Sequence, residues 1–452
     1  MPFLPSEWTE RVAFDRAHVW HPFTQEKELV ADPPVPVIGA EGCDYLLADG
    51  RRVLDGISSW WCNVHGHGHP RLVGALERQA GRLDHVMFAG FTHEPALELV
   101  ARLRPRLPAQ LTRAFYSDNG STAVEVALKM AFQAQFQKGE PQRLRFGALR
   151  EGYHGDTLGA LGVGELENWL TGLFKPLLLA CDRLEVPEDP RRELSPDLTG
   201  WEERLNKALA AVRAFFEAHG AHLAAFIAEP LVQGAGGMRF WPPELLQEIR
   251  RQCDRCGVYL ILDEVMTGFG RTGTFLALDQ CGVQPDFLCL SKGLTGGLLP
   301  LSMTWTTEAV YGCFWGEVAE GKTFFHGHTF TANPVACAVA IASLGLFDDE
   351  PVLARTQELA TTLRTAWTEL AKLPAIRRAR TLGPIAACQI VNPITGQPYP
   401  SEQRFGWKLH RRALDHGLLV RPMGDCLYLM PPLATPPERA CQAVATLREL
   451  LG

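Results

Sequence analysis

The sequence predicts an α/β fold with a large, mostly parallel sheet domain and a smaller α+β domain. The chain has 452 residues, of which 46% are hydrophobic and 21% charged, so it can bury a sizeable core. Short apolar runs alternate with longer amphipathic runs from about residue 66 to 330, which is typical of a parallel sheet covered by helices. After Pro334 this alternation gives way to two long helical patterns.

The alternating region contains clear candidates for individual elements. Predicted strands are RAFYSD (113–118), LAAFIAEP (223–230), VYLILDEV (258–265) and DFLCLS (286–291). Apolar spacings of three and four predict helices over STAVEVALKMAFQAQF (121–136) and ELLQEIRRQCDRCG (244–257). We therefore expect a large domain over 66–334 and a small domain over 335–452, with residues 1–65 packing against the small domain.

Charge and composition exclude several classes of partner. The formal net charge is -7 and no block rich in Lys and Arg occurs, which argues against nucleic acid. The N-terminal stretch MPFLPSEWTERVAFDR lacks the basic start and apolar core of a signal peptide, and no uncharged run of about 18 apolar residues predicts a membrane span. We expect a cytoplasmic protein whose twelve cysteines are reduced.

Three motifs allow other interpretations. Cys253 and Cys256 form a CxxC, but its place at a helix end favours coincidence over a metal or redox role. The run HGHGH (65–69) puts alternate imidazoles on one face of an extended segment, yet no carboxylate or cysteine adjoins it, so we predict no metal site. VQGAGG (232–237) resembles a dinucleotide or methyltransferase loop without completing GxGxxG, which leaves a methyltransferase as a rival function.

Polar residues follow each predicted strand. In open parallel sheets, ligands bind beyond the carboxyl ends of the strands. The residues in question are Asp118 to Ser121, Glu229, Asp263 with Glu264, and Ser291 with Lys292.

Lys292 and Asp263 each close a strand and lie 29 residues apart (292 minus 263). If the strands are neighbours, the amine and the carboxylate face one crevice. A desolvated lysine has a lowered pKa and attacks carbonyls to form a Schiff base. Pyridoxal phosphate (PLP) uses both groups, since the lysine holds its aldehyde and the carboxylate keeps its ring nitrogen protonated.

The same cofactor needs a phosphate site and an aromatic face. Gly120 and Ser121 open a predicted helix, whose first N–H groups attract anions. Tyr153 lies in the short glycine-bounded loop EGYHGDT (151–157) and offers a ring. Taken singly, each feature is more often a helix cap or a core residue; together they predict a site.

Two longer motifs carry a family resemblance. ILDEVMTGFGRTG (261–273) followed by SKGLTGG (291–297) resembles the class III PLP-dependent aminotransferases. Five further stretches are similar to the branch of that family that makes 7,8-diaminononanoate in biotin biosynthesis: HVWHPFTQ (18–25), SSWWCNVHGHGHP (58–70), DNGSTAVEVALKMAFQ (118–133), EPLVQGAGGMRF (229–240) and RPMGDCLYLMPP (421–432). The resemblance implies a fold-type I homodimer with active sites at the subunit interface.

The resemblance also implies a role for each matching residue that binds the cofactor. Lys292 would form the Schiff base, Asp263 would pair with the ring nitrogen, and Tyr153 would cover the ring and the substrate. Gly120 and Ser121 would bind the phosphate. The stretch FFHGHTFTANP (324–334) would serve the active site of the other subunit. There, Gly327 would touch the substrate, while His328 and Thr329 would complete the phosphate site.

The implied substrates are 8-amino-7-oxononanoate and, as amino donor, S-adenosylmethionine. Trp60 would line the pocket for the acyl chain and Arg421 would bind a substrate carboxylate. Phe23 departs from the family pattern, because many members have tyrosine there. This departure leaves lysine as an alternative donor. Another class III ω-aminotransferase activity is a separate alternative within the family.

Overall fold

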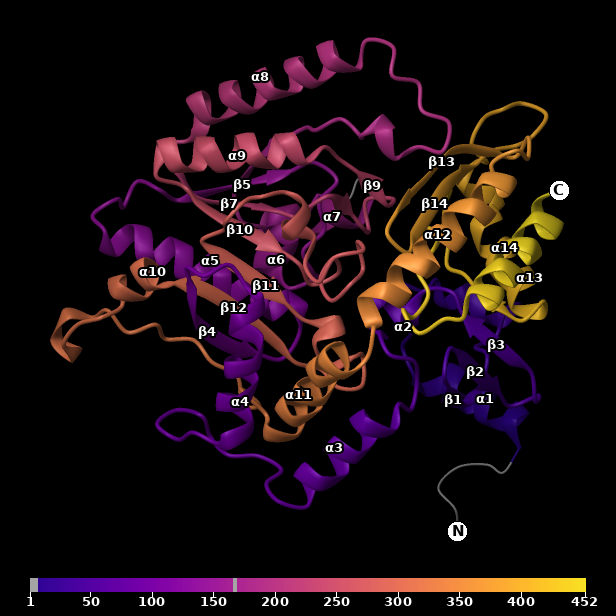
Figure 1. Ribbon diagram of the computed structural model, residues 1–452, viewed down its shortest axis with the longest axis horizontal. Helices are drawn as coiled ribbons and strands as arrows, with labels where there is room; N and C mark the ends of the chain where they lie inside the picture. Colours follow the sequence, from indigo (N-terminus) through magenta and orange to yellow (C-terminus); the bar gives the residue numbers. More distant parts are fainter. Residues whose placement is uncertain (1–6, 166–168) are drawn as a thin grey trace.

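The computed structural model describes residues 7–165 and 169–452, and Figure 1 shows their arrangement. Within this part of the chain the larger sheet has seven strands, in the order β4-β12-β11-β10-β7-β5-β6. β12 runs antiparallel to both of its neighbours, and the other pairs are parallel. The strands are β4 (Leu111–Ser117), β5 (Arg145–Leu149), β6 (Cys181–Leu184), β7 (Leu223–Ala228), β10 (Tyr259–Asp263), β11 (Phe287–Leu290) and β12 (Ser302–Thr307). The predicted fold class is confirmed.

Alternate residues of each central strand point to opposite faces, and each face is covered by helices. In β10, Leu260 and Leu262 belong to the core beneath α8 and α9, whereas Tyr259 and Ile261 belong to the core beneath α5. Figure 1 shows α8 and α9 lying together along one side of the sheet. The helices of the sheet region are α3 (Pro70–Ala80), α4 (Glu94–Leu103), α5 (Gly120–Gln137), α6 (Leu158–Val163), α7 (Trp169–Phe174), α8 (Trp201–His219), α9 (Pro243–Cys256) and α10 (Glu308–Cys313).

The C-terminal part forms a second core around Trp367. Its antiparallel sheet is β13-β14-β16, packed with α12 and α14. These elements are β13 (Ile376–Leu382), β14 (Ile385–Ile390), β16 (Cys426–Leu429), α12 (Val352–Leu370), α13 (Phe405–Asp415) and α14 (Pro437–Leu451). The preceding helix α11 (Pro334–Asp349) instead packs against α3 and α4, beside the large sheet.

The N-terminal strands join the C-terminal part through a shared sheet. Its order is β1-β2-β3-β15, in which β15 pairs in parallel with β3, and Figure 1 shows β1 to β3 beside the yellow C-terminal helices. The elements are α1 (Trp8–His18), β1 (Val37–Glu41), β2 (Asp44–Leu47), β3 (Arg52–Asp55) and β15 (Leu418–Leu419). Both ends of the chain therefore contribute to one unit.

The short segment α2 (Ser58–Trp61), which we call the left-handed turn, has an unusual backbone. Its four residues have φ angles of 53°, 51°, 79° and 71°, all in the left-handed region. This region costs about 1–2 kcal/mol for each residue that carries a Cβ. Contacts with the C-terminal part offset this cost, since Ser58 Oγ donates to Met430 O at 2.8 Å and Trp61 Nε1 donates to Tyr428 Oη at 3.0 Å.

The histidines of HGHGH have separate structural partners. His65 Nε2 lies 3.0 Å from Ser343 Oγ, His67 Nε2 lies 3.0 Å from Asp55 Oδ2, and His69 caps α3. The sequence had placed no carboxylate beside this run, and the fold brings Asp55 to it. Over residues 7–165 and 169–452, no three His, Cys, Asp or Glu side chains group as metal ligands.

The cysteines are all free thiols. Burial raises the pKa of the Cys253 thiol well above its ordinary value, which disfavours the reactive thiolate at the CxxC. No described helix is long and apolar enough to cross a membrane.

Candidate active site

The carboxyl edge of the large sheet brings Lys292 and Asp263 together. β10 and β11 are parallel neighbours, with Asp263 opposite Cys289, and Lys292 follows the end of β11. Both side chains line one cavity of about 630 Å³, as do Gly120, Ser121 and Tyr153. These five residues, all singled out from the sequence, thus share one cavity.

The Lys292 amine lies against an aromatic ring. Its Nζ is 4.9 Å from the centre of the Trp61 ring, which belongs to the left-handed turn. Burial lowers the pKa of Lys292, and the carboxylates of Asp263 and Glu229 only partly oppose this effect. The amine is therefore neutral, and so nucleophilic, at a lower pH than an exposed lysine.

Asp263 is fixed by two hydrogen-bond partners. Its Oδ1 accepts from the Val265 backbone N–H at 3.0 Å, and its Oδ2 lies 2.8 Å from His154 Nδ1. His154 also lines the cavity, and its buried Nε2 has no hydrogen-bond partner within the described residues. Sequence reasoning assigned no role to His154, although EGYHGDT places it directly after Tyr153.

The start of α5 also lines the cavity. The Asn119 side chain accepts from the backbone N–H of the third helical residue at 3.1 Å, which leaves the first two N–H groups, of Gly120 and Ser121, without an intrahelical partner. Ser121 Oγ lies 2.6 Å from Thr157 Oγ1. A Cβ on Gly155 would lie 2.3 Å from Ser121 Oγ, so only glycine allows this close approach. N–H groups and hydroxyls at a helix N-terminus suit a phosphate.

Tyr153 is held by a buried carboxylate. Its backbone N–H donates to Glu229 Oε1 at 3.0 Å, and the Gly234 N–H donates to Glu229 Oε2 at 3.0 Å. Burial raises the pKa of Glu229 to about 7. The Tyr153 hydroxyl donates to Asp156 Oδ2 at 3.0 Å.

Phe23 and Arg421 both lie near Trp60, the chain neighbour of Trp61, which lines this cavity. The Phe23 and Trp60 ring centres are 5.3 Å apart, and Arg421 Cζ lies 5.4 Å from the Trp60 ring. Phe23 and Arg421 line a second pocket of about 400 Å³. Burial lowers the pKa of Arg421, and no carboxylate is among the charged groups that act on it within the described residues. A half-buried, unpaired guanidinium is suited to an anionic ligand.

The segment with Gly327, His328 and Thr329 lies outside both pockets. Gly327 and Thr329 are exposed, and His328 Nδ1 lies 3.2 Å from Asp118 Oδ2. Within a single chain the structure does not bring these three residues to the cavity.

The donor set fits PLP. The cavity offers an amine for its aldehyde, a carboxylate for its ring nitrogen and free N–H groups for its phosphate. Sheet order and site placement define the fold-type I architecture of PLP-dependent transferases. The chain belongs to the aminotransferase class-III family, whose sequence model matches residues 28–451.

Individual relatives cover nearly the whole chain. An adenosylmethionine-8-amino-7-oxononanoate aminotransferase from Synechococcus elongatus is 45% identical, over 96% of this chain and 98% of the relative. A crystal structure of the enzyme of that name from Methanocaldococcus jannaschii is 32% identical, with a TM-score of 0.91, over 98% of this chain and 99% of that one. An amine transaminase from an uncultivated Pseudomonas species, solved in its PLP-bound form, is 32% identical, with a TM-score of 0.86. The match covers 96% of this chain and 98% of that one.

Proposed function

We propose that this chain binds PLP and transfers an amino group from S-adenosylmethionine to 8-amino-7-oxononanoate, giving 7,8-diaminononanoate for biotin synthesis. The observation that carries the proposal is the single cavity that Lys292 and Asp263 line together. The relatives named above support the choice of substrates.

PLP, when bound, supplies an aldehyde and an electron-withdrawing ring that stores an electron pair. Asp263, oriented by His154, holds a proton on the ring nitrogen. Lys292 Nζ, whose pKa is lowered by burial, would remove the proton from the amine-bearing carbon of the donor and return one to C7 of the acceptor. Trp61 covers the amine and excludes water.

The second pocket supports binding of the substrates' carboxylates. Both substrates carry one, and they occupy the site in turn. Arg421 would pair with either carboxylate, and the flat face of Trp60 would contact the acyl chain or the sulfonium cation.

We also propose a homodimer in the cytoplasm. The proposed phosphate ligands His328 and Thr329 would reach the partner's cavity, as would Gly327 toward the substrate. Large apolar side chains are exposed in the same segment, with Phe325 85% and Phe330 59% exposed, which favours an interface there.

The test of the proposed function offers purified protein 8-amino-7-oxononanoate with either S-adenosylmethionine or lysine, and measures the diamine by mass spectrometry. We expect product with S-adenosylmethionine. Product with lysine alone would show that the donor is wrong. Transfer from simple ω-amines to pyruvate, without diamine formation, would overturn the pathway assignment.

Lysine remains the second candidate donor because of Phe23. The ring packs on Trp60 but lacks the hydroxyl that tyrosine would present beside the second pocket. Phe23→Tyr is therefore the informative variant: if it switches the preferred donor, Phe23 determines donor choice.

A further inference from the structure

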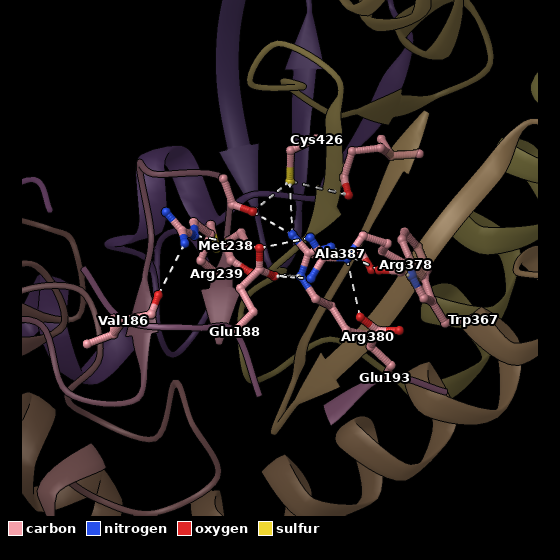
Figure 2. Close-up of polar contacts among 12 residues, drawn as sticks. Val186, Glu188, Glu193, Met238, Arg239, Trp367, Arg378, Arg380, Ala387 and Cys426 are labelled. Atoms are coloured by element: carbon pink, nitrogen blue, oxygen red, sulfur yellow. Dashed lines mark hydrogen bonds and ion pairs between the residues drawn. The ribbon is translucent and has the colours of Figure 1, made fainter. Parts of the chain in front are cut away.

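Arg380 on β13 reaches from the C-terminal part to the backbone of residues 237 and 238. Arg380 is 4% exposed, and Figure 2 shows its guanidinium between Met238, Glu188 and Cys426. Its Nε donates to Met238 O at 2.9 Å and its Nη2 donates to Gly237 O at 2.6 Å. Cys426 Sγ on β16 donates to the same Gly237 oxygen at 3.2 Å. Side chains from two strands of the small sheet thus donate hydrogen bonds to the successive backbone carbonyls of Gly237 and Met238.

These carbonyls belong to a tight turn, residues 234–238, between β8 (Val232–Gln233) and β9 (Arg239–Phe240). Gly237 has φ +97°, and the Met238 N–H donates to Gly234 O at 2.9 Å, which closes the turn. The sequence motif VQGAGG, which had resembled a cofactor loop, forms this turn.

The turn lies directly against the walls of the active site. A Cβ on Gly236 would lie 2.3 Å from Glu151 O, two residues before Tyr153, and one on Gly234 would lie 3.4 Å from the Trp61 ring. The Gly234 N–H also donates to Glu229, the carboxylate that accepts from the Tyr153 N–H. A shift of the turn would therefore move both walls.

We propose that Arg380 is a positioning residue, which clamps the 234–238 turn from the small sheet and thereby sets the positions of Glu229 and Tyr153. The planar guanidinium suits this role because it donates to two carbonyls at once, which a lysine ammonium on a flexible stem does poorly. Its effect on catalysis rests on the proposed function; its effect on the turn does not.

The test measures backbone hydrogen exchange at Gly234 and Tyr153 in the protein as purified, together with kcat and KM for diamine formation. We expect Arg380→Met to raise exchange at both amides by about tenfold or more, because the turn opens locally. Arg380→Lys should fall between Arg380→Met and the wild type. In both variants kcat should fall more than KM rises, since the reacting groups are displaced while Arg421 is untouched.

Two control variants separate the clamp from the charges around it. Glu188 lies 3.9 Å from Arg380 and also pairs with Arg378, whose side chain is 40% exposed and does not contact the turn. Glu188→Gln and Arg378→Gln should leave exchange at Gly234 and Tyr153 unchanged.

The proposal is overturned if Glu188→Gln reproduces the loss of protection, or if a folded Arg380→Met keeps wild-type exchange. If Arg380→Met does not fold, Arg380→Lys takes its place in the test. The proposal is then overturned if exchange at Gly234 and Tyr153 is no faster in Arg380→Lys than in Glu188→Gln. Should neither donor give diamine, the exchange measurement still tests the clamp.

Discussion

At Lys292, burial and charge act on one amine in opposite directions. Burial lowers the pKa, while Asp263 and Glu229 raise it, and burial has the larger effect. The cavity thus favours the neutral form of an amine that lies beside a carboxylate, and the neutral form is the one that can accept a proton from a substrate carbon.

This balance predicts a pH-dependent stability in cofactor-free protein. The unfolded chain binds the Lys292 proton up to a pKa of about 10.4, whereas the folded chain loses it at lower pH. The unfolded state therefore binds more protons between the two pKa values, and the free energy of unfolding rises with pH in that window. Lys292→Met removes this contribution. The free energy of unfolding of both proteins is measured with urea over a range of pH. The difference between the variant and the wild type should become smaller as the pH approaches about 10.4. A difference that does not change with pH would contradict a lowered pKa of Lys292.

Asp263 allows a test of cofactor electronics apart from cofactor binding. Asp263→Asn keeps the shape but removes the charge that holds a proton on the ring nitrogen. We expect bound PLP to remain while the donor half-reaction, followed by absorbance in stopped flow, slows by about 100-fold or more. Asp156→Asn is the matched control, because that exposed carboxylate contacts the Tyr153 hydroxyl in the same cavity. Equal effects of both changes would mean that no specific pairing occurs.

Individual residues differ in how well the sequence predicted them. Lys292 and Asp263 were predictable because strand ends in a parallel sheet meet at one edge. The choice between Trp60 and Trp61 was not, since only the backbone of the left-handed turn determines that Trp61 covers Lys292 while Trp60 faces Arg421. The contact of His154 with Asp263 joins residues 109 apart in sequence, which no local pattern reveals.

At the scale of elements, the strongest periodic patterns were the most predictable. The four predicted strands correspond to β4, β7, β10 and β11. The helices predicted over 121–136 and 244–257 correspond to α5 and α9. β12 was missed because its sequence, SMTWTT, is buried yet rich in hydroxyls. Thr304 Oγ1 donates to Ala123 O at 2.8 Å, a partner that only the folded chain provides.

The first turn of α5 yields a prediction at this scale. Asn119→Ala should lower the free energy of unfolding by about 1 kcal/mol, because the helix loses its capping side chain. Frayed N–H groups should also bind PLP more weakly, which a fluorescence titration measures. Asn119→Asp keeps the cap but adds a negative charge near the phosphate, so stability should persist while affinity falls. An Asp variant with unchanged affinity would place the phosphate elsewhere.

For the whole molecule, the central question is where the sites are completed. The α/β class and the presence of a smaller sheet followed from composition and alternation, whereas the seven-stranded order required the fold. The predicted boundaries at residues 65 and 334 stay predictions. So does the role of Thr329, which the single chain leaves exposed.

Shared sites predict complementation between two defective subunits. Lys292→Ala removes the amine and Thr329→Ala weakens the partner's phosphate site, so homodimers of either variant should have little activity. In a mixed dimer, one of the two sites regains both residues, and co-expression should restore about a quarter of wild-type activity. The readout is diamine formation by the purified mixture. No gain over the sum of the separate variants would mean that each chain completes its own site.

The left-handed turn has a consequence for the order of folding. Four residues of positive φ are unfavourable in isolation, so the segment has no local tendency to form early. Its partners Met430 and Tyr428 lie near the other end of the chain, 372 and 367 residues away in sequence from the residues they contact. Closing so long a loop is slow. The sheet can form before this closure, but Trp61 cannot cover Lys292 until it occurs. We therefore expect refolding to regain secondary structure first and the capacity to bind PLP last, so the active site is the final part of the molecule to mature.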